Sequence, residues 1–392
     1  MDRKSVESTD LFDADDWIGD VKDVQNRLHA VSNPYRGNKR KMLIDLASVC
    51  REEGLQEKIE GGQVLDLFSG SAFCSYLFKS MGAAVWSNDL LAFSYLSAVS
   101  LVENSTVIPS KEQIRFILKN KPTDCGTRIR DNYVGVRFTE EEAETLDRWI
   151  RNLEIQHGDR PIAELVEFYN DIDYAVENLG EDFDPDSHRS AAHLFAQEAI
   201  MLLHFIVRTT DLGGRLNNGQ VVARVDHRIE NKGRTFIERN IRPYNLHFNN
   251  GLTSVATRMD AIDLLKQFDL SDLDLVYIDP PYGGDQSDYA KMYEFFEDYL
   301  GFSDIHNEWE KERFAKSKTY AESFDELLSL LPKQSPWIFS YNDSSWASGE
   351  EIKNQISKFD RSRVVMHEVD YEYQYRAKDN SAGTEYVIVA HP

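Results

Sequence analysis

The chain has 392 residues, of which 41% are hydrophobic and 28% are charged, and this balance favours a folded core over a disordered chain. Its 67 acidic and 44 basic residues give a net charge of −23, which argues against a protein that coats nucleic acid non-specifically but leaves room for a local basic patch. The three cysteines lie far apart, so we expect neither a disulfide framework nor a metal site. The longest strongly apolar run, residues 199–207, is too short to span a membrane, and no signal-peptide pattern is present. We therefore expect a soluble, cytoplasmic protein with no membrane partner.

The first predicted elements follow an acidic lead-in, residues 1–32, which we expect to be frayed or docked on the surface. Four basic residues then gather around a Gly-Asn turn at residues 36–41, and apolar residues at helical spacing follow them. Residues 62–70 predict a buried strand and a glycine turn, and residues 71–83 predict an amphipathic helix. A second strand, residues 84–89, ends in an acid.

The middle of the chain changes its charge. Residues 139–190 are strongly acidic and predict solvated helices and loops, whereas residues 205–248 are basic with aromatic residues among them. Strand and helix signals then alternate again, with strands expected at 275–278, 336–343, 363–371 and 384–390 and helices at 289–300 and 350–359. This alternation predicts an α/β fold with a mostly parallel sheet and helices on both faces, in which ligands bind outside the carboxyl ends of the strands.

The first glycine turn, Asp66 to Gly70, closes a strand and opens a helix, and Asp89 ends the next strand. In doubly wound folds such a turn lets the backbone approach a nucleotide, and the second acid can bind ribose hydroxyls. An ordinary strand–helix turn with a capping side chain would look the same. One glycine and an acid make a poor pyrophosphate site, so the turn suits a cofactor with a positive charge, such as the sulfonium of S-adenosylmethionine.

The strongest motif is Asp279-Pro280-Pro281-Tyr282, which directly follows an apolar strand. An exocyclic aromatic amine is a poor nucleophile because its lone pair is conjugated with the ring. A carboxylate and a rigidly held carbonyl that accept its N–H bonds would direct that lone pair towards a methyl donor, and consecutive prolines supply the rigidity. Tyr282 offers a face on which a flipped base can stack. The alternative is a Pro-terminated strand with a surface tyrosine.

Two weaker motifs complete the pattern. In the basic segment, Lys39 can pair with a ligand carboxylate such as the methionine end of S-adenosylmethionine, although most such clusters are solvated helix starts. Asp260, in Met259-Asp260-Ala261-Ile262, can accept an adenine amino group, but a helix N-cap explains it equally well.

In this order, the motifs resemble those of the Dam-like, adenine-specific DNA methyltransferases of the alpha arrangement. The resemblance covers residues 33–98 and 250–392 and implies a methyltransferase (Rossmann-like) sheet that uses S-adenosylmethionine, base flipping and direct displacement without a metal. It implies that the cofactor is bound by Tyr35 and Lys39 at its methionine end, by Asp66, Phe68 and Gly70 in the first turn, by Asp89 at the ribose, and by Asp260 and Ala261 at the adenine. It also implies that Asp279, Pro280, Pro281 and Tyr282 form the catalytic motif, in which Asp279 and Pro280 activate the target amine and Tyr282 stacks on the target base.

The chain departs from the family pattern at two places. Ala72 stands where the family usually has a second glycine in the first turn, which puts the contact there in question. The stretch at residues 211–219 differs from the usual sequence before the recognition hairpin, and this leaves the recognised DNA sequence open.

These observations predict a catalytic domain of residues 33–105 and 250–392, interrupted by a partly helical target-recognition region at residues 106–249. The expected partner is double-stranded DNA, and a cognate restriction endonuclease is a further candidate. The candidate contacts to phosphate or guanine are Arg215, Arg224, Arg228, Lys232, Arg234, Arg239 and Arg242. Methylation of adenine in RNA, methylation of the cytosine amine, and a non-catalytic DNA-binding relative remain as alternatives.

Overall fold

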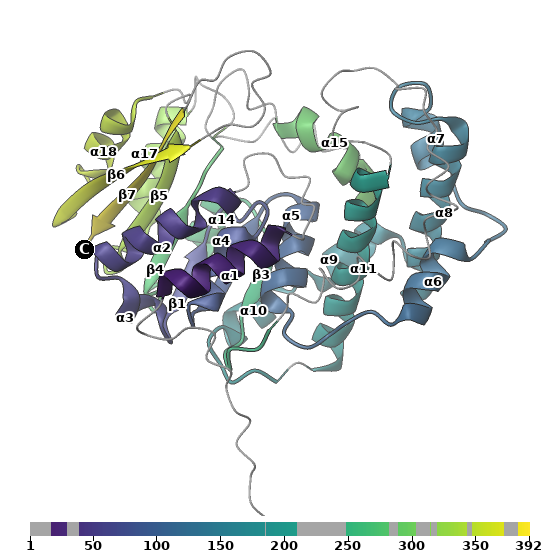
Figure 1. Cartoon of the computed structure of the whole chain (residues 1–392), viewed down its shortest axis with the longest axis horizontal. Helices are drawn as coiled ribbons and strands as arrows, with labels where there is room; N and C mark the ends of the chain where they lie inside the picture. Colours follow the sequence, from purple (N-terminus) through teal and green to yellow (C-terminus); the bar gives the residue numbers. More distant parts are fainter. Residues whose placement is uncertain are drawn as a thin grey trace, which may run out of the picture.

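The computed structural model describes residues 17–29, 39–184, 186–209, 248–281, 289–302, 314, 320–342, 347–371 and 383–392. Within these residues, seven strands form one sheet in the order β3-β2-β1-β4-β5-β7-β6 (Figure 1). The strands are β1 (Gln63–Asp66), β2 (Ala84–Asp89), β3 (Val255–Arg258), β4 (Leu275–Ile278), β5 (Trp337–Asn342), β6 (Arg363–Tyr371) and β7 (Gly383–His391).

The sheet is parallel from β3 to β5, and β7 then runs antiparallel to β5 and to β6. The strands β1, β2 and β3 are added in one direction and β4 and β5 in the other, so the chain changes its direction of winding between β1 and β4. Crevices that bind ligands open at the carboxyl ends of the strands at such a point.

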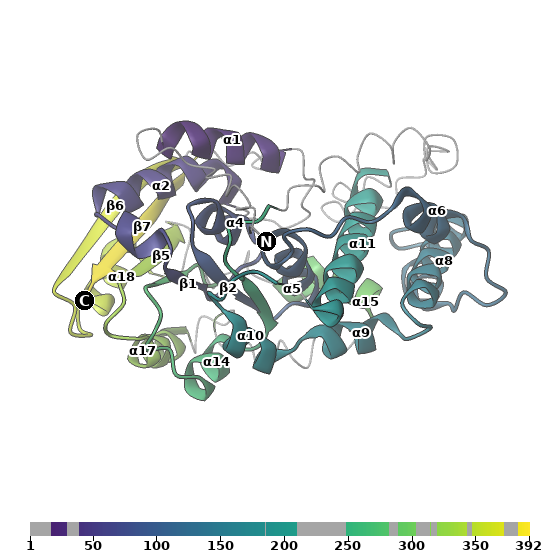
Figure 2. The ribbon, with the colours of Figure 1, turned by 90° about the horizontal axis from the view of Figure 1, so that it is seen from below.

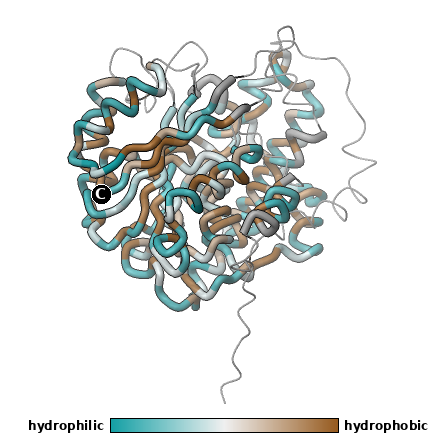
Figure 3. The backbone as a smooth tube through the Cα atoms, turned by 60° about the vertical axis from the view of Figure 1, so that its left-hand side comes forward, coloured by the Kyte–Doolittle hydropathy of each residue, from teal (hydrophilic) through white to brown (hydrophobic). Residues whose placement is uncertain are grey.

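Alternate residues of the strands face two separate layers of helices, as the period of two of a strand requires. Val64 packs with helices on one face, and its neighbour Leu65 packs with helices on the other. Figure 2 shows α1, α2 and α4 above the sheet and α10, α14 and α17 below it. Figure 3 shows apolar stretches along the strands and hydrophilic stretches on the outer helices and turns.

The first helical layer contains α1 (Trp17–His29), η1 (Lys39–Met42), α2 (Leu43–Glu52), α3 (Gln56–Ile59), α4 (Phe73–Ser80), α5 (Ala92–Ala98), the π-helical turn η2 (Val99–Glu103) and α15 (Tyr289–Leu300). The second contains α10 (Ile172–Asn178), α14 (Ala261–Gln267), α17 (Tyr320–Leu330) and α18 (Gly349–Ile356). In α1, Val21, Val24 and Leu28 are buried, so this part of the acidic lead-in is a docked helix and is not frayed.

The middle of the chain forms α6 (Lys111–Lys119), α7 (Arg128–Tyr133), α8 (Glu140–Gln156), α9 (Ile162–Tyr169), α10 and α11 (Ser187–Thr209). Figure 1 shows α6, α7 and α8 at the end of the molecule away from β6 and β7. The acidic stretch is helical, as the sequence predicted, but α8 also has a buried face that includes Trp149, and its start is a capping box between Thr139 and Glu142.

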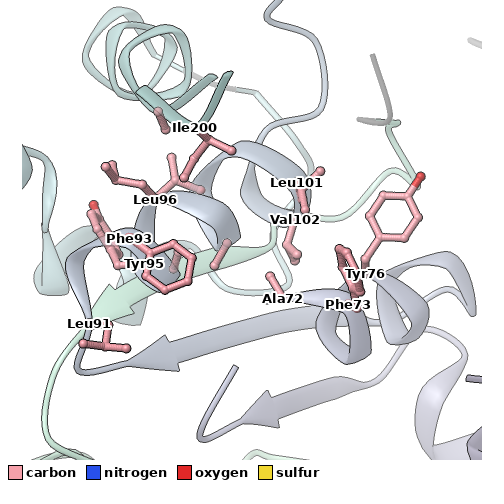
Figure 4. Close-up of a cluster of buried hydrophobic side chains, with 14 of the residues drawn as sticks. Ala72, Phe73, Tyr76, Leu91, Phe93, Tyr95, Leu96, Leu101, Val102 and Ile200 are labelled. Atoms are coloured by element: carbon pink, nitrogen blue, oxygen red, sulfur yellow. The ribbon is translucent and has the colours of Figure 1, made fainter. Parts of the chain in front are cut away.

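The long helix α11 packs directly on the core of the sheet domain. Figure 4 shows Ile200 of α11 beside Leu96 of α5, in a cluster that continues to Ala72 and Phe73 of the first turn and α4. A buried ion pair also joins the two parts, because Arg189 of α11 donates to Glu103 of η2. The second carboxylate oxygen of Glu103 accepts the backbone N–H of Ala256 in β3, 2.9 Å away.

The expected strands and helices of both blocks are present, and the prediction of a mostly parallel sheet is confirmed. The sequence did not predict β3, which is only four residues long. Residues 210–247, which include the seven basic candidates for DNA contact, lie outside the described residues, as do Tyr35 and Tyr282.

Candidate active site

Four predicted acids gather at one edge of the sheet because each follows the carboxyl end of a neighbouring parallel strand. Asp66 and Asp89 end β1 and β2, and Asp279 directly follows β4. Asp260 lies two residues beyond β3. Asp66 and Asp279 therefore follow two adjacent strands, one on each side of the point where the winding changes direction.

Asp66 is completely buried, and it lacks a full set of partners. Its Oδ2 accepts a hydrogen bond of 2.6 Å from the hydroxyl of Ser75 in α4, whereas its Oδ1 accepts none within the part of the chain that the structure describes. Burial raises the pKa of this carboxyl to about 7, and the nearby charges of Asp279 and Asp89 raise it further against the lowering effect of Ser75. A buried acceptor of this kind suits a ligand that brings a positive charge or a donor.

The first turn is bound to the end of β2 through its backbone. Asp89 accepts hydrogen bonds from the N–H of Gly70, at 2.7 Å, and from the N–H of Leu91, at 2.9 Å. Burial raises the pKa of Asp89 to about 6, against the lowering effect of these bonds. The turn and the acid that the sequence predicted as separate cofactor contacts thus form one rigid unit.

Ala72, at the position where the family usually has glycine, adopts a left-handed conformation with φ of 60°. This region favours glycine because a Cβ crowds the neighbouring carbonyl. The left-handed conformation of Ala72 costs about 1 kcal/mol in strain, and the alanine methyl is fully buried in the core cluster.

At the same edge of the sheet, Lys39 joins two acidic side chains. Its Nζ lies 3.4 Å from Oδ1 of Asp279 and 3.1 Å from Oε2 of Glu385 in β7. Lys39 and Glu385 are both buried, whereas Asp279 is partly exposed. The basic segment thus directs an ammonium group into the site and is not only a solvated helix start. Its predicted contact with the methionine end of a cofactor stays a prediction.

The remaining described candidates are placed as follows. Phe68 is partly buried and makes an edge contact with Phe314, with ring centroids 5.4 Å apart. Oδ1 of Asp260 accepts the N–H groups of Ile262 and Asp263 and therefore caps α14. Asp260 is thus the N-cap of α14, and a second role towards an adenine stays a prediction. Ala261, Gly70 and Pro280 are buried, and Pro281 is partly buried.

Two buried glutamates at this site were missed. Glu385 reaches the site from the antiparallel strand β7. The sequence signal that could have indicated it is an acid directly before the apolar run Tyr386–Ala390. Glu297 of α15 accepts the backbone N–H groups of Ala92 and Phe93 at the start of α5, and burial raises its pKa to about 7. The sequence of α15 gives no sign of this role, because a glutamate in an amphipathic helix is ordinarily exposed.

The order of the strands and the acids at the point where the winding changes direction define a methyltransferase-type α/β protein. Comparison with known families identifies the class of methyltransferase. The chain belongs to the D12 class N6 adenine-specific DNA methyltransferase family, whose model matches residues 35–329. The resemblance drawn from the motifs is therefore confirmed: the protein is an enzyme that transfers a methyl group from a donor to adenine in DNA.

Among individual proteins, the chain is similar to the Type II methyltransferase M2.HphI of Haemophilus parahaemolyticus. The two are 25% identical over 353 residues, which cover 88% of this chain and 93% of that protein. No solved structure matches the chain significantly. Within the described residues, no helix is long and apolar enough to cross a membrane, and no group of three or more His, Cys, Asp and Glu side chains could hold a metal ion.

Proposed function

We propose that the methyl donor is S-adenosylmethionine and that it binds at the first turn, beside Asp66 and Asp89. The observation that carries this proposal is the buried Oδ1 of Asp66, which lacks a hydrogen-bond partner in the described structure and lies within a group of acids. S-adenosylmethionine has a sulfonium and an ammonium group, so it brings the positive charge that such a site favours. When bound, it supplies an electrophilic methyl group.

The other predicted contacts assign each part of the cofactor to a different place along the edge of the sheet. Asp89, held by the turn, would accept the ribose hydroxyls, and Phe68 would pack beside the cofactor. Asp260 and Ala261 at the start of α14 would adjoin the adenine, and Tyr35 and Lys39 the methionine end. The acids also favour release of the product, because S-adenosylhomocysteine has lost the positive charge of the sulfonium.

On the target side, we propose that Asp279 and the carbonyl of Pro280 accept the two N–H bonds of the adenine amine. The amine nitrogen gains positive charge as it receives the methyl group, and Asp279 stabilises that charge. No strong base is required, because the proton is acidic once the nitrogen is cationic. Tyr282 would stack on the extruded base, so transfer is direct and needs no covalent enzyme intermediate.

We further propose that residues 106–249 recognise the DNA, with the seven basic residues between Arg215 and Arg242 at phosphates or guanines. The net negative charge of the chain would repel DNA elsewhere and orient the encounter. The relative M2.HphI is named a Type II methyltransferase, which supports a role in restriction and modification. A cognate endonuclease is the further partner that we propose. The cytoplasm is the proposed location, because the DNA substrate lies there.

The test is binding and transfer measured in parallel on the wild-type protein. Calorimetry should detect S-adenosylmethionine binding, and a labelled methyl group should transfer to a DNA duplex that contains adenine. Duplexes in which every adenine is replaced by a base without an amino group, and RNA of the same sequence, serve as controls. Transfer only to RNA or to cytosine would refute the assignment, and absence of cofactor binding would refute S-adenosylmethionine as the donor.

A further inference from the structure

Glu385 is a buried acid that none of the motifs includes. It is 3% exposed, and its backbone pairs with Asn342 at the end of β5. Because β7 runs antiparallel to β5, the start of β7 reaches the edge of the sheet at which β1, β4 and β5 end. Glu385 therefore enters the active site from the opposite chain direction to Asp66 and Asp279.

The two residues that follow Glu385 on the same face of β7 are apolar. Val387 and Val389 point to the same face of β7 as Glu385, and both are completely buried in the core beneath the first helical layer. A carboxylate at this position loses its hydration, and replacing a buried ion pair by apolar residues often leaves stability unchanged or raises it. The carboxylate at this buried position therefore indicates a role in function and not in stability.

The partner of Glu385 links it to the proposed chemistry. Oε2 of Glu385 lies 3.1 Å from Nζ of Lys39, which is 6% exposed, and the same ammonium lies 3.4 Å from Oδ1 of Asp279. Two carboxylates thus share one ammonium group. Coulomb interactions among such groups are strong because so little water screens them.

We infer that Glu385 is a positioning residue that, by holding Lys39, preserves negative charge on Asp279 for the target amine. This inference rests on the proposed function of Asp279. If Glu385 were neutral, the Lys39 ammonium would offset more of the negative charge of Asp279, and less of that charge would be available to the amine. The positive charge that develops on the amine nitrogen in the transition state would then be less stabilised.

The experiment compares Glu385→Gln with wild type in single-turnover methylation of an adenine-containing duplex at saturating S-adenosylmethionine. We expect the rate to fall by about tenfold or more, while the dissociation constants for cofactor and duplex stay within about threefold. Glu385→Asp keeps the charge and should recover part of the rate. The matched control is Glu368→Gln, the same change at an exposed residue of the neighbouring β6, which should leave the rate unchanged.

A double-mutant cycle with Lys39→Met separates this role from a merely structural one. If Glu385 acts through Lys39, adding Glu385→Gln to Lys39→Met should cause little further loss of rate. The inference would be overturned if the rate losses of the two single variants multiplied in the double variant. It would also be overturned by a wild-type rate in Glu385→Gln, or by a loss of cofactor affinity in that variant as large as its loss of rate. Should Glu385→Gln fail to fold by its melting curve, Glu385→Asp takes its place, and a loss of rate in Glu385→Asp that persists undiminished in the Lys39→Met background would overturn it. A wild-type enzyme that binds cofactor but does not methylate adenine would instead refute the function proposed for Asp279.

Discussion

The ionisation of Asp66 should control how cofactor affinity depends on pH. Burial raises the pKa of this carboxyl to about 7 in the free protein, and its Oδ1 has no hydrogen-bond donor in the described structure. A cationic ligand needs the ionised form. Half of the molecules have it at pH 7 and about one in eleven at pH 6, so the affinity should fall about fivefold between these values, or about 1 kcal/mol.

Calorimetric titration with S-adenosylmethionine at several pH values, in buffers of different ionisation enthalpy, measures both the affinity and the protons released. Asp66→Asn should bind more weakly at pH 7 and lose most of the pH dependence. Asp89 titrates lower, near 6, and Glu297 near 7, so Glu297→Gln is the control that should keep the slope. A slope that persists in Asp66→Asn, or no slope in wild type, would refute the assignment of the orphaned oxygen to the cofactor.

Three further predictions concern the ribose acid, the stability of the fold and the DNA interface. Asp89→Ala should weaken S-adenosylmethionine binding about tenfold or more, since a hydrogen bond to a charged group contributes about 1.5–3 kcal/mol, and unchanged affinity would mean that the first turn is misinterpreted. In the cofactor-free protein the pKa of Asp66 lies above its ordinary value near 3.8, so ionisation destabilises the fold as pH rises from about 4 to about 7. Asp66→Asn should therefore raise the melting temperature more at pH 8 than at pH 5. An equal change at the two pH values would contradict the raised pKa. The double variant Arg228→Ala with Arg234→Ala should make the salt dependence of DNA binding shallower by about one unit for each phosphate that is no longer neutralised, and an identical slope would place the DNA interface elsewhere, first at the basic residues 36–41.

The central strands were predictable because burial on both faces leaves a recognisable mark. Leu275–Ile278 is continuously apolar, and such runs bounded by turns are typical of parallel strands. The strand β3 has no such mark, since Val255–Arg258 is short and ends in polar residues. It is held by its neighbours instead, for example by the hydrogen bond of 2.8 Å from the indole N–H of Trp86 to Thr257.

The acids of the site were predictable for a topological reason. Parallel strands that alternate with helices bring their carboxyl ends to one edge, so Asp66, Asp89 and Asp279 had to converge. Glu385 could not be placed in this way, because it stands 346 residues from Lys39 and comes from the antiparallel part of the sheet. Local patterns carry no information about such a pairing until the register of β7 against β5 is known.

The most direct test of the central claim compares wild type with Asp279→Ala in a host whose DNA lacks methylated adenine. Genomic DNA is sequenced for N6-methyladenine after expression, and S-adenosylmethionine binding is measured on both purified proteins. We predict methylated adenine at a defined sequence with wild type and none with Asp279→Ala, while the two proteins bind the cofactor within a few-fold of each other. Methylated adenine produced by Asp279→Ala at the level of wild type would contradict the account.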